Sequence, residues 1–191
     1  MLLSQFTEDL IEAGVDEAGR GCLAGSVVAA AVILPKNYQN EYLRDSKKLN
    51  KKQRLALEEI IKKEALHYAI SEVLPQKIDE INILQASFLA MHLAIEQLEI
   101  KPEFLLIDGN RFKPFPKIKH QCVIKGDDKY LAIAAASVLA KTHRDRLMEN
   151  LAKDFPNYLW QKNMGYPTKF HYQAIQDFGI TDWHRRSFRL F

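Results

Sequence analysis

The chain has 191 residues, of which 47% are hydrophobic, 27% charged and 10% aromatic. These proportions are typical of a globular protein and exclude collagen-like, low-complexity and disordered classes. The length suits one domain, which we expect to cover residues 1–191. No apolar run reaches the roughly 18 residues of a membrane span, and the first residues lack the basic start of a signal peptide. We therefore expect a cytoplasmic protein without a membrane partner, whose two cysteines, Cys22 and Cys122, stay reduced.

Positive charge is concentrated in the last quarter of the chain. The net charge is +3, but residues 141–191 carry nine Lys and Arg against five Asp and Glu, whereas residues 1–140 carry 18 against 19. A basic segment of this kind can follow a phosphate backbone, although a solvated surface of mixed charge is the commoner explanation.

The first half of the chain predicts a β-hairpin, a helix and a third strand. One strand ends near Asp16, a glycine-containing turn follows, and residues 26–34 form a β-branched and alanine-rich strand that stops at Pro35. Asn50 can cap a helix with apolar residues on one side, and residues 67–74 predict another strand.

The second half predicts helices alternating with short strands. Apolar residues recur at spacings of three and four over residues 82–98, which is typical of a packed helix. The elements expected after it are strands over residues 104–107 and 121–124, a long helix over residues 129–151, and two short helices with loops around Pro156 and Pro167. We expect residues from about 150 to 191 to form a helical, basic C-terminal segment.

This order of elements predicts an α/β fold with a mixed sheet. Consecutive strands at the start favour antiparallel pairing, and strands separated by helices favour parallel crossovers later. A doubly wound nucleotide-binding fold is disfavoured, because Gly19, Gly21 and Gly25 do not fit G-x-G-x-x-G and lead into a strand.

Acidic residues follow several of the apolar strands. Asp16 and Glu17 end the first strand, Asp108 ends another, and Asp127 follows the last. Carboxylates are costly to bring together unless a cation neutralises them, and this oxygen set is the one that Mg²⁺ or Mn²⁺ prefers. Taken singly, each acid has an ordinary alternative: Asp127 or Asp128 could cap the next helix, and Asp108 could be a turn residue.

Seven short motifs in the sequence together resemble those of a known enzyme family. They are DEAGRG at residues 16–21, DSKKL at 45–49, IDGN at 107–110, KGD at 125–127, AAASVLAK at 134–141, GYPT at 165–168 and HRRSF at 184–188. Together, and in this order, they resemble the bacterial type 2 ribonucleases H, the ribonuclease HII family. The resemblance implies a ribonuclease H-like fold, with a mixed five-stranded sheet flanked by helices and a C-terminal segment that binds substrate.

The resemblance also implies an activity. The expected enzyme is an endonuclease that cuts 5′ to ribonucleotides in RNA/DNA hybrids and at single ribonucleotides embedded in duplex DNA. Its catalytic, metal-binding residues would be Asp16, Glu17, Asp108 and Asp127, with Mg²⁺ or Mn²⁺ as cofactor. Two metal ions would activate water and stabilise the leaving oxygen, giving 5′-phosphate and 3′-hydroxyl ends. The expected roles are ribonucleotide excision repair and RNA primer removal.

Eight further residues are implied in substrate binding. The turn Gly19, Arg20 and Gly21 would approach the ribose 2′-hydroxyl, and Tyr166 would pack on the following sugar. The remaining four are expected to contact phosphates: Lys47, Asn82, Ser137 and Lys141. For Asn82 a helix N-cap is an equally good interpretation, and an isolated tyrosine is commonly a half-buried ring with a bonded hydroxyl.

Some features stay outside this assignment. Arg185 and Arg186 suit salt bridges within the fold as well as nucleic-acid contacts, and His171 suits packing. Cys22 stands where the family usually has proline, and the small buried hydrophobe is the favoured interpretation. The last residues show no clear sliding-clamp motif, and we expect a monomer. The alternatives are another nuclease of the same fold, such as a junction resolvase, and a non-catalytic nucleic-acid-binding module.

Overall fold

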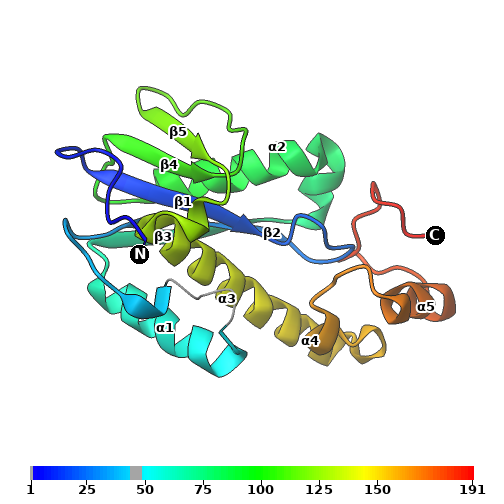
Figure 1. Ribbon diagram of the computed structural model, residues 1–191. Helices are drawn as coiled ribbons and strands as arrows, with labels where there is room; N and C mark the ends of the chain where they lie inside the picture. Colours follow the sequence, from blue (N-terminus) through cyan, green and yellow to red (C-terminus); the bar gives the residue numbers. More distant parts are fainter. Residues whose placement is uncertain (1, 44–48) are drawn as a thin grey trace.

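The computed structural model describes residues 2–43 and 49–191. Within these residues, five strands form one sheet in the order β3-β2-β1-β4-β5 (Figure 1). The elements in chain order are β1 (Glu12–Ala18), β2 (Val27–Ile33), α1 (Lys51–Glu64), β3 (His67–Val73), α2 (Pro75–Glu96), β4 (Phe104–Asp108), β5 (Lys119–Val123), η2 (Gly126–Asp128), α3 (Leu131–Asp154), η3 (Pro156–Tyr158), α4 (Trp160–Asn163) and α5 (Lys169–Phe178). The pairs β1–β2 and β2–β3 are antiparallel, and the pairs β1–β4 and β4–β5 are parallel. This confirms the expected mixed sheet.

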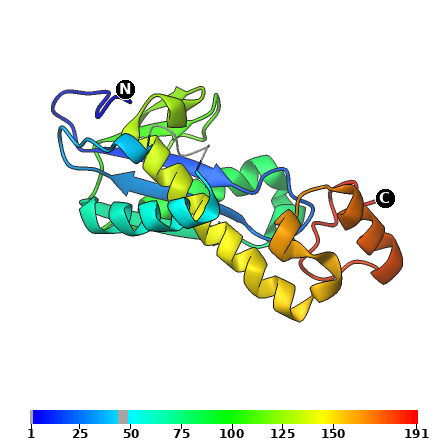
Figure 2. The same cartoon turned by 60° about the horizontal axis from the view of Figure 1, so that its bottom comes forward.

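Helices cover both faces of the sheet, and the side chains of β2 contribute to the core on each face. Successive side chains of a strand point to opposite faces of its sheet. Accordingly, the odd-numbered residues from Val27 to Ile33 belong to the core beneath α2. The even-numbered residues from Val28 to Val32 belong to a second core beneath α1 and α3. The strand is therefore apolar throughout, and the molecule has a helix layer on each side of the sheet (Figures 1 and 2).

A third core holds the C-terminal segment to the rest of the chain. Because α3 continues to Asp154, this segment comprises residues 156–191 rather than starting near residue 150. Trp160 and Ile175 pack with Met148 near the end of α3 and with Leu23 and Ala24 of the loop after β1. Figure 2 shows the segment projecting beyond the sheet at the far end of α3. The two expected short helices are present as α4 and α5. In the part of the chain that the structure describes, no helix is long and apolar enough to cross a membrane.

The sequence predicted the start of α1 correctly, but not the start of α2. Asn50 caps α1 as expected: its side chain accepts from the Gln53 amide, and the Gln53 side chain accepts from the Asn50 amide. By contrast, α2 begins at Pro75 rather than at residue 82. Asn82 interrupts this helix with φ of 66°, and its Oδ1 accepts hydrogen bonds from the amides of Leu84 and Gln85. The predicted N-cap chemistry is present, but inside a longer, broken helix.

Candidate active site

The acidic residues come together because parallel strands end at the same edge of the sheet. In the β1–β4 pair Val15 lies opposite Ile107, so Asp16 and Asp108 are the next residues on neighbouring strands. β5 lies beside β4, and η2 follows it with Asp127. The Gly126 amide donates to Asp108 Oδ1 at 2.6 Å, which ties the η2 turn to the end of β4. We call Asp16, Glu17, Asp108 and Asp127 the carboxylate cluster.

Burial and like charge act on the cluster together. Asp16 is 6% exposed, and its pKa is raised well above the ordinary value by burial and by the negative charges of Glu17 and Asp108. Hydrogen bonds from the Ser137 side chain and the Glu17 amide partly oppose this rise in pKa. Burial likewise raises the pKa of Glu17, against the effect of Arg20, whose Nη1 lies 3.0 Å from Glu17 Oε1. For Asp16 and Glu17, burial and like charge therefore raise the pKa more than the hydrogen bonds and Arg20 lower it.

The donor chemistry of the cluster fits a hard divalent cation. Glu17 Oε2 is buried and has no hydrogen-bond partner, which is costly unless another group engages it. Carboxylate oxygens are the ligands that Mg²⁺ and Mn²⁺ prefer. As the side chains lie, however, no three Asp, Glu, His or Cys residues among the described ones are arranged to hold a metal ion. The other oxygen of Glu17 faces Arg20, and Asp108 Oδ1 faces the Gly126 amide.

Asp127 and Asp128 differ in their surroundings. Asp127 is 8% exposed and lies within the η2 turn, whereas the Asp128 side chain is exposed. Burial beside the end of β4 is the environment expected of a cluster member. The geometry therefore favours Asp127 over its neighbour.

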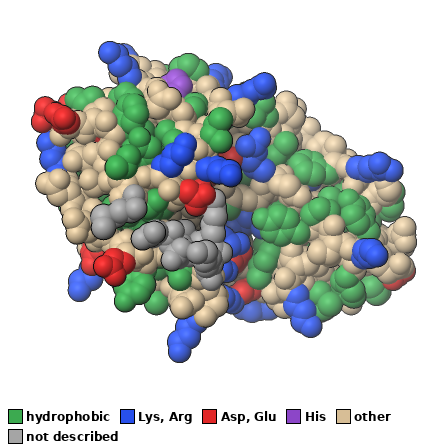
Figure 3. Space-filling view, viewed as in Figure 1, with side chains coloured by type: hydrophobic (Ala, Val, Ile, Leu, Met, Phe, Trp, Pro, Cys, Tyr) green, Lys and Arg blue, Asp and Glu red, His purple; other side chains and the backbone are tan. Residues whose placement is uncertain are grey.

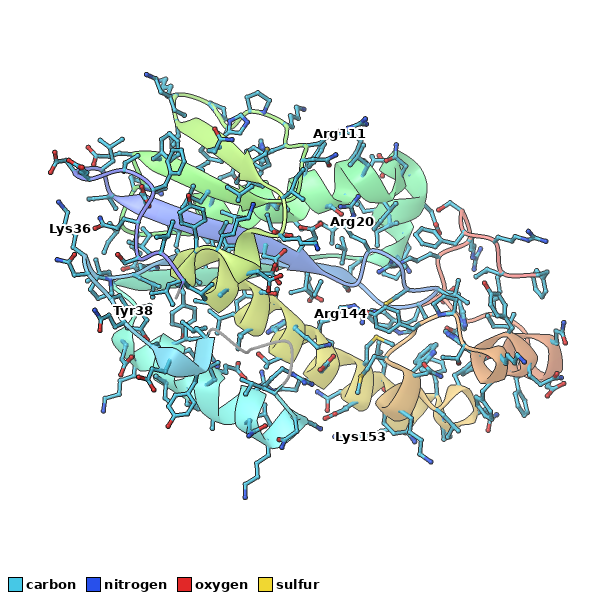
Figure 4. The ribbon with its side chains drawn as sticks, viewed as in Figure 1. Arg20, Lys36, Tyr38, Arg111, Arg144 and Lys153 are labelled. Carbon is cyan, nitrogen blue, oxygen red and sulfur yellow. The ribbon has the colours of Figure 1, made fainter. Side chains whose placement is uncertain are left out.

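Gly19, Arg20 and Gly21, which we call the GRG turn, follow β1 directly. Gly19 has φ of +93°, and a Cβ there would lie 2.0 Å from Arg144 Nε, so both backbone conformation and space demand glycine. Gly21 is exposed and has no heavy atom within 4 Å of a built Cβ. Figure 4 shows Arg20 beside the end of β1 and Arg144 between α3 and the loop that follows the strand.

Tyr166 lies in the segment between α4 and α5 and is 45% exposed. Its hydroxyl is a hydrogen-bonding partner of the Cys22 thiol, which is fully buried. Burial raises the pKa of both groups. Cys22 is thus the small buried residue that the sequence predicted, and it has an additional contact with Tyr166 that the sequence did not indicate.

The other predicted substrate residues occupy different places. Ser137 and Lys141 lie on α3 one turn apart, with Ser137 bonded to Asp16 and Lys141 Nζ 3.8 Å from Asp145. Asn82 belongs to α2, which covers the opposite face of the sheet. Lys47 lies outside the described residues. Basic and acidic side chains lie near one another in the middle of the face shown in Figure 3, and further basic ones lie over the C-terminal segment.

Of three arginines near the C-terminal segment, Arg186 behaves as the sequence suggested, whereas Arg185 and Arg144 do not. Arg186 forms the expected kind of ion pair, with Nη2 3.2 Å from Asp182 Oδ1. Arg185 forms no salt bridge with any residue that the structure describes, and its buried guanidinium donates instead to the main-chain carbonyls of Arg20 and Gly25. Arg144 makes similar contacts and was not predicted at all. No local sequence signal could indicate these bonds, since any residue can supply a carbonyl.

A family model described as Ribonuclease HII matches residues 13–191. The chain belongs to the ribonuclease HII family. It is 63% identical over 190 residues to a ribonuclease HII of Bacteroides thetaiotaomicron, covering 100% of this chain and 95% of that protein. It is also 60% identical over 190 residues to a ribonuclease HII of Phocaeicola vulgatus, covering 100% of this chain and 94% of that protein. The chain is therefore a type 2 ribonuclease H, an endonuclease acting on RNA/DNA hybrids, and the two alternative classes are set aside.

Solved structures give the same fold. The ribonuclease H2 of Pyrococcus horikoshii superposes with a TM-score of 0.79 at 26% identity, covering 94% of both chains. The ribonuclease HII of Archaeoglobus fulgidus, solved in complex with PCNA, superposes with a TM-score of 0.75 at 26% identity. The match covers 94% of this chain and 96% of that one. Bst-RNase HIII in complex with Mn²⁺ superposes with a TM-score of 0.76 at 17% identity. The match covers 95% of this chain and 68% of that one. These neighbours confirm the expected ribonuclease H-like fold of this ribonuclease HII family member.

Proposed function

We propose that the enzyme hydrolyses the phosphodiester bond 5′ to a ribonucleotide, both in RNA/DNA hybrids and at single ribonucleotides embedded in duplex DNA. The products would be a 5′-phosphate and a 3′-hydroxyl, as ribonucleotide excision repair and primer removal require. The observation that supports this best is the convergence of Asp16, Glu17 and Asp108 at one sheet edge, where their charges act on one another, next to the GRG turn.

The carboxylate cluster would hold Mg²⁺ or Mn²⁺. When bound, a divalent ion of this kind stabilises charge on the scissile phosphate and lowers the pKa of a coordinated water. The protein's part is to orient the oxygens: Ser137 and the Glu17 amide fix Asp16, and the Gly126 amide fixes Asp108. The buried, unpartnered Glu17 Oε2 is an available ligand atom.

Recognition of the ribonucleotide would be shared between the GRG turn and Tyr166. Backbone groups can approach a 2′-hydroxyl closely at Gly21, because no neighbouring atom surrounds the position of its missing side chain. The exposed ring of Tyr166 would pack on the next sugar, where a second 2′-hydroxyl would crowd it. Lys141, Ser137, Lys47 and Asn82 are the proposed contacts along the phosphate backbone.

The test uses three labelled duplexes in Mg²⁺ or Mn²⁺: all DNA, DNA with one internal ribonucleotide, and an RNA/DNA hybrid. We expect cutting 5′ to the lone ribonucleotide and within the hybrid, and no cutting of DNA. Asp16→Asn should lower the rate by at least about a thousandfold, because one buried ligand charge is lost. It should still bind the duplex, since the proposed contacts of the GRG turn, Tyr166 and Lys141 are unchanged.

Asp128→Asn is the matched control, because it makes the same chemical change at the exposed neighbour of Asp127. This variant should cut at a rate close to the unmodified enzyme, whereas Asp127→Asn should not. Full activity of Asp16→Asn, or cutting of the all-DNA duplex, would contradict the proposed site.

A further inference from the structure

Two arginine side chains are buried beside the GRG turn without forming ion pairs among the described residues. Arg144 on α3 is 2% exposed, and Arg185 in the C-terminal segment is fully buried. Each guanidinium donates three hydrogen bonds, and every acceptor is a main-chain carbonyl. A buried charge is normally paired, so this arrangement calls for a reason other than stability alone.

Arg144 joins the loop after the GRG turn to the segment that carries Tyr166. Its Nη2 and Nε donate to the carbonyls of Ala24 and Ser26, at 3.0 and 3.1 Å, and its Nη1 donates to that of Met164 at 2.9 Å. Gly19 packs directly on the same side chain. One guanidinium therefore contacts the GRG turn, the loop that follows it and the approach to Tyr166.

Arg185 holds the GRG turn from the other side. Its Nη1 donates to the Arg20 carbonyl at 3.0 Å, and its Nε and Nη2 both donate to that of Gly25, at 3.0 and 2.9 Å. Its own amide donates to the Leu23 carbonyl at 2.8 Å. Since Arg185 belongs to the C-terminal segment, these bonds fix the turn relative to that segment.

Direct contacts complete the connection between the two loops. The Leu23 amide donates to the Gly165 carbonyl at 2.8 Å, and the Tyr166 hydroxyl is hydrogen-bonded with the Cys22 thiol. Gly165 lies so close to Ala24 that a Cβ there would be 2.6 Å from its carbonyl oxygen. The GRG turn and Tyr166 are thus held as one unit, although they are far apart in the sequence.

We propose that Arg144 and Arg185 are positioning residues that fix the spacing between the GRG turn and Tyr166. This spacing sets the preference for a ribonucleotide followed by a deoxyribonucleotide. The inference rests on the proposed function, in which the turn meets the ribose and Tyr166 meets the next sugar. Lysine cannot replace either residue, because an ammonium lacks the planar fork that reaches several carbonyls at once.

The test compares kcat/KM for two duplexes of the same length and sequence. One has a single ribonucleotide followed by DNA, and the other has an all-RNA strand paired with DNA. In Arg144→Lys and Arg185→Lys, the ratio of the first kcat/KM to the second should fall at least tenfold. Tyr166 would no longer sit where it distinguishes the two sugars. Arg146→Lys on the same helix, whose guanidinium pairs with Glu58 instead, should keep the ratio.

A double-mutant cycle separates positioning from general damage. If the arginines act through Tyr166, then adding Arg144→Lys or Arg185→Lys to Tyr166→Ala should not lower the ratio further. Near-ultraviolet circular dichroism checks that each variant is folded. Should Arg144→Lys not fold, Arg185→Lys carries the test, and failure of both to fold would overturn the positioning role.

Two other outcomes are decisive. Equal losses on both substrates, with the ratio preserved, would show that the arginines only stabilise the fold and would overturn the inference while leaving the proposed function intact. If the unmodified enzyme did not cut 5′ to the lone ribonucleotide, the proposed function itself would fail, and the inference with it. The two failures are distinguished by the unmodified enzyme alone.

Discussion

Gly14 lies in β1 two residues before Asp16, at the point where α3 crosses the strand. A Cβ at this position would be 2.2 Å from the main-chain carbon of Ala132 and 2.4 Å from the amide nitrogen of Ile133. Backbone therefore packs directly on backbone, and α3 reaches closer to the sheet than any side chain would allow. Ser137, farther along the same helix, is consequently near enough to bond with Asp16.

Gly14→Ala should lower the free energy of unfolding by about 3 kcal/mol or more, because a methyl group would have to push two backbones apart. Urea denaturation measures the change. Gly21→Ala is the matched control, since no atom lies within 4 Å of its added Cβ, and its stability should change by less than about 0.5 kcal/mol. A similar, small loss for both variants would contradict the close packing described here.

The sequence predicted the members of the carboxylate cluster better than their partners. Asp16 and Asp108 were predictable because apolar strands end at them, and parallel neighbours end at one edge. That Ser137 bonds to Asp16 depends on the position of α3, which sequence periodicity does not fix. Arg144 and Arg185 were missed because their acceptors are main-chain carbonyls, which carry no residue-specific signal.

At the scale of elements, α2 shows a conflict between local signals. The apolar spacing and Asn82 predicted a helix start at residue 82, whereas the helix begins at Pro75. Proline at the first helical position is itself a start signal. The chain therefore contains two starts, and Asn82, with φ of 66°, caps the second part of one broken helix. Both interpretations of Asn82, cap and substrate contact, remain compatible with this position.

Substitutions of Asn82 distinguish its role as a helix cap from a role as a substrate contact. Asn82→Ala should lower the free energy of unfolding by about 1–2 kcal/mol, because it loses both the capping oxygen and a side chain that tolerates positive φ. Asn82→Asp keeps a capping oxygen and should restore most of the stability, as chemical denaturation would show. Activity of the Asp variant then decides the second interpretation. A loss of kcat/KM at restored stability would support a phosphate contact, since the new negative charge would repel the substrate. No loss of stability in Asn82→Ala would contradict the capping role.

At the scale of the whole molecule, the C-terminal segment is joined to the ribonuclease H-like body by the third apolar core and by the hydrogen bonds of Arg144 and Arg185. Inside the segment, buried polar rings are hydrogen-bonded to one another. Its centre is a pair of buried histidines, His171 and His184, whose Nε2 atoms lie 3.2 Å apart. Trp160 Nε1 donates to His171 Nε2 at 3.0 Å, and the Thr181 amide donates to His184 Nδ1 at 2.9 Å. His171 Nδ1 lies 3.0 Å from the Tyr166 carbonyl oxygen, so the pair also supports the loop that carries Tyr166.

This histidine pair makes the stability of the enzyme depend on pH. Burial, and then the neighbouring His171, lower the pKa of His184 from its ordinary 6.5 to about 4, and burial lowers the pKa of His171 as well. The unfolded chain therefore binds protons more readily than the folded one. The stabilisation is fully present above about pH 6.5 and is lost as the pH falls towards 4.

Between pH 7 and 4.5 we expect His184 to account for a loss on the order of 2–3 kcal/mol in the free energy of unfolding. Urea unfolding, followed by tryptophan fluorescence at several pH values, measures it. His184→Gln replaces the titrating ring with an amide that can still accept from Thr181, so its stability should decline less steeply with falling pH. Carboxylates contribute equally to both proteins and cancel in the comparison. Identical slopes for the two proteins would show that the buried pair does not govern the acid stability of the molecule.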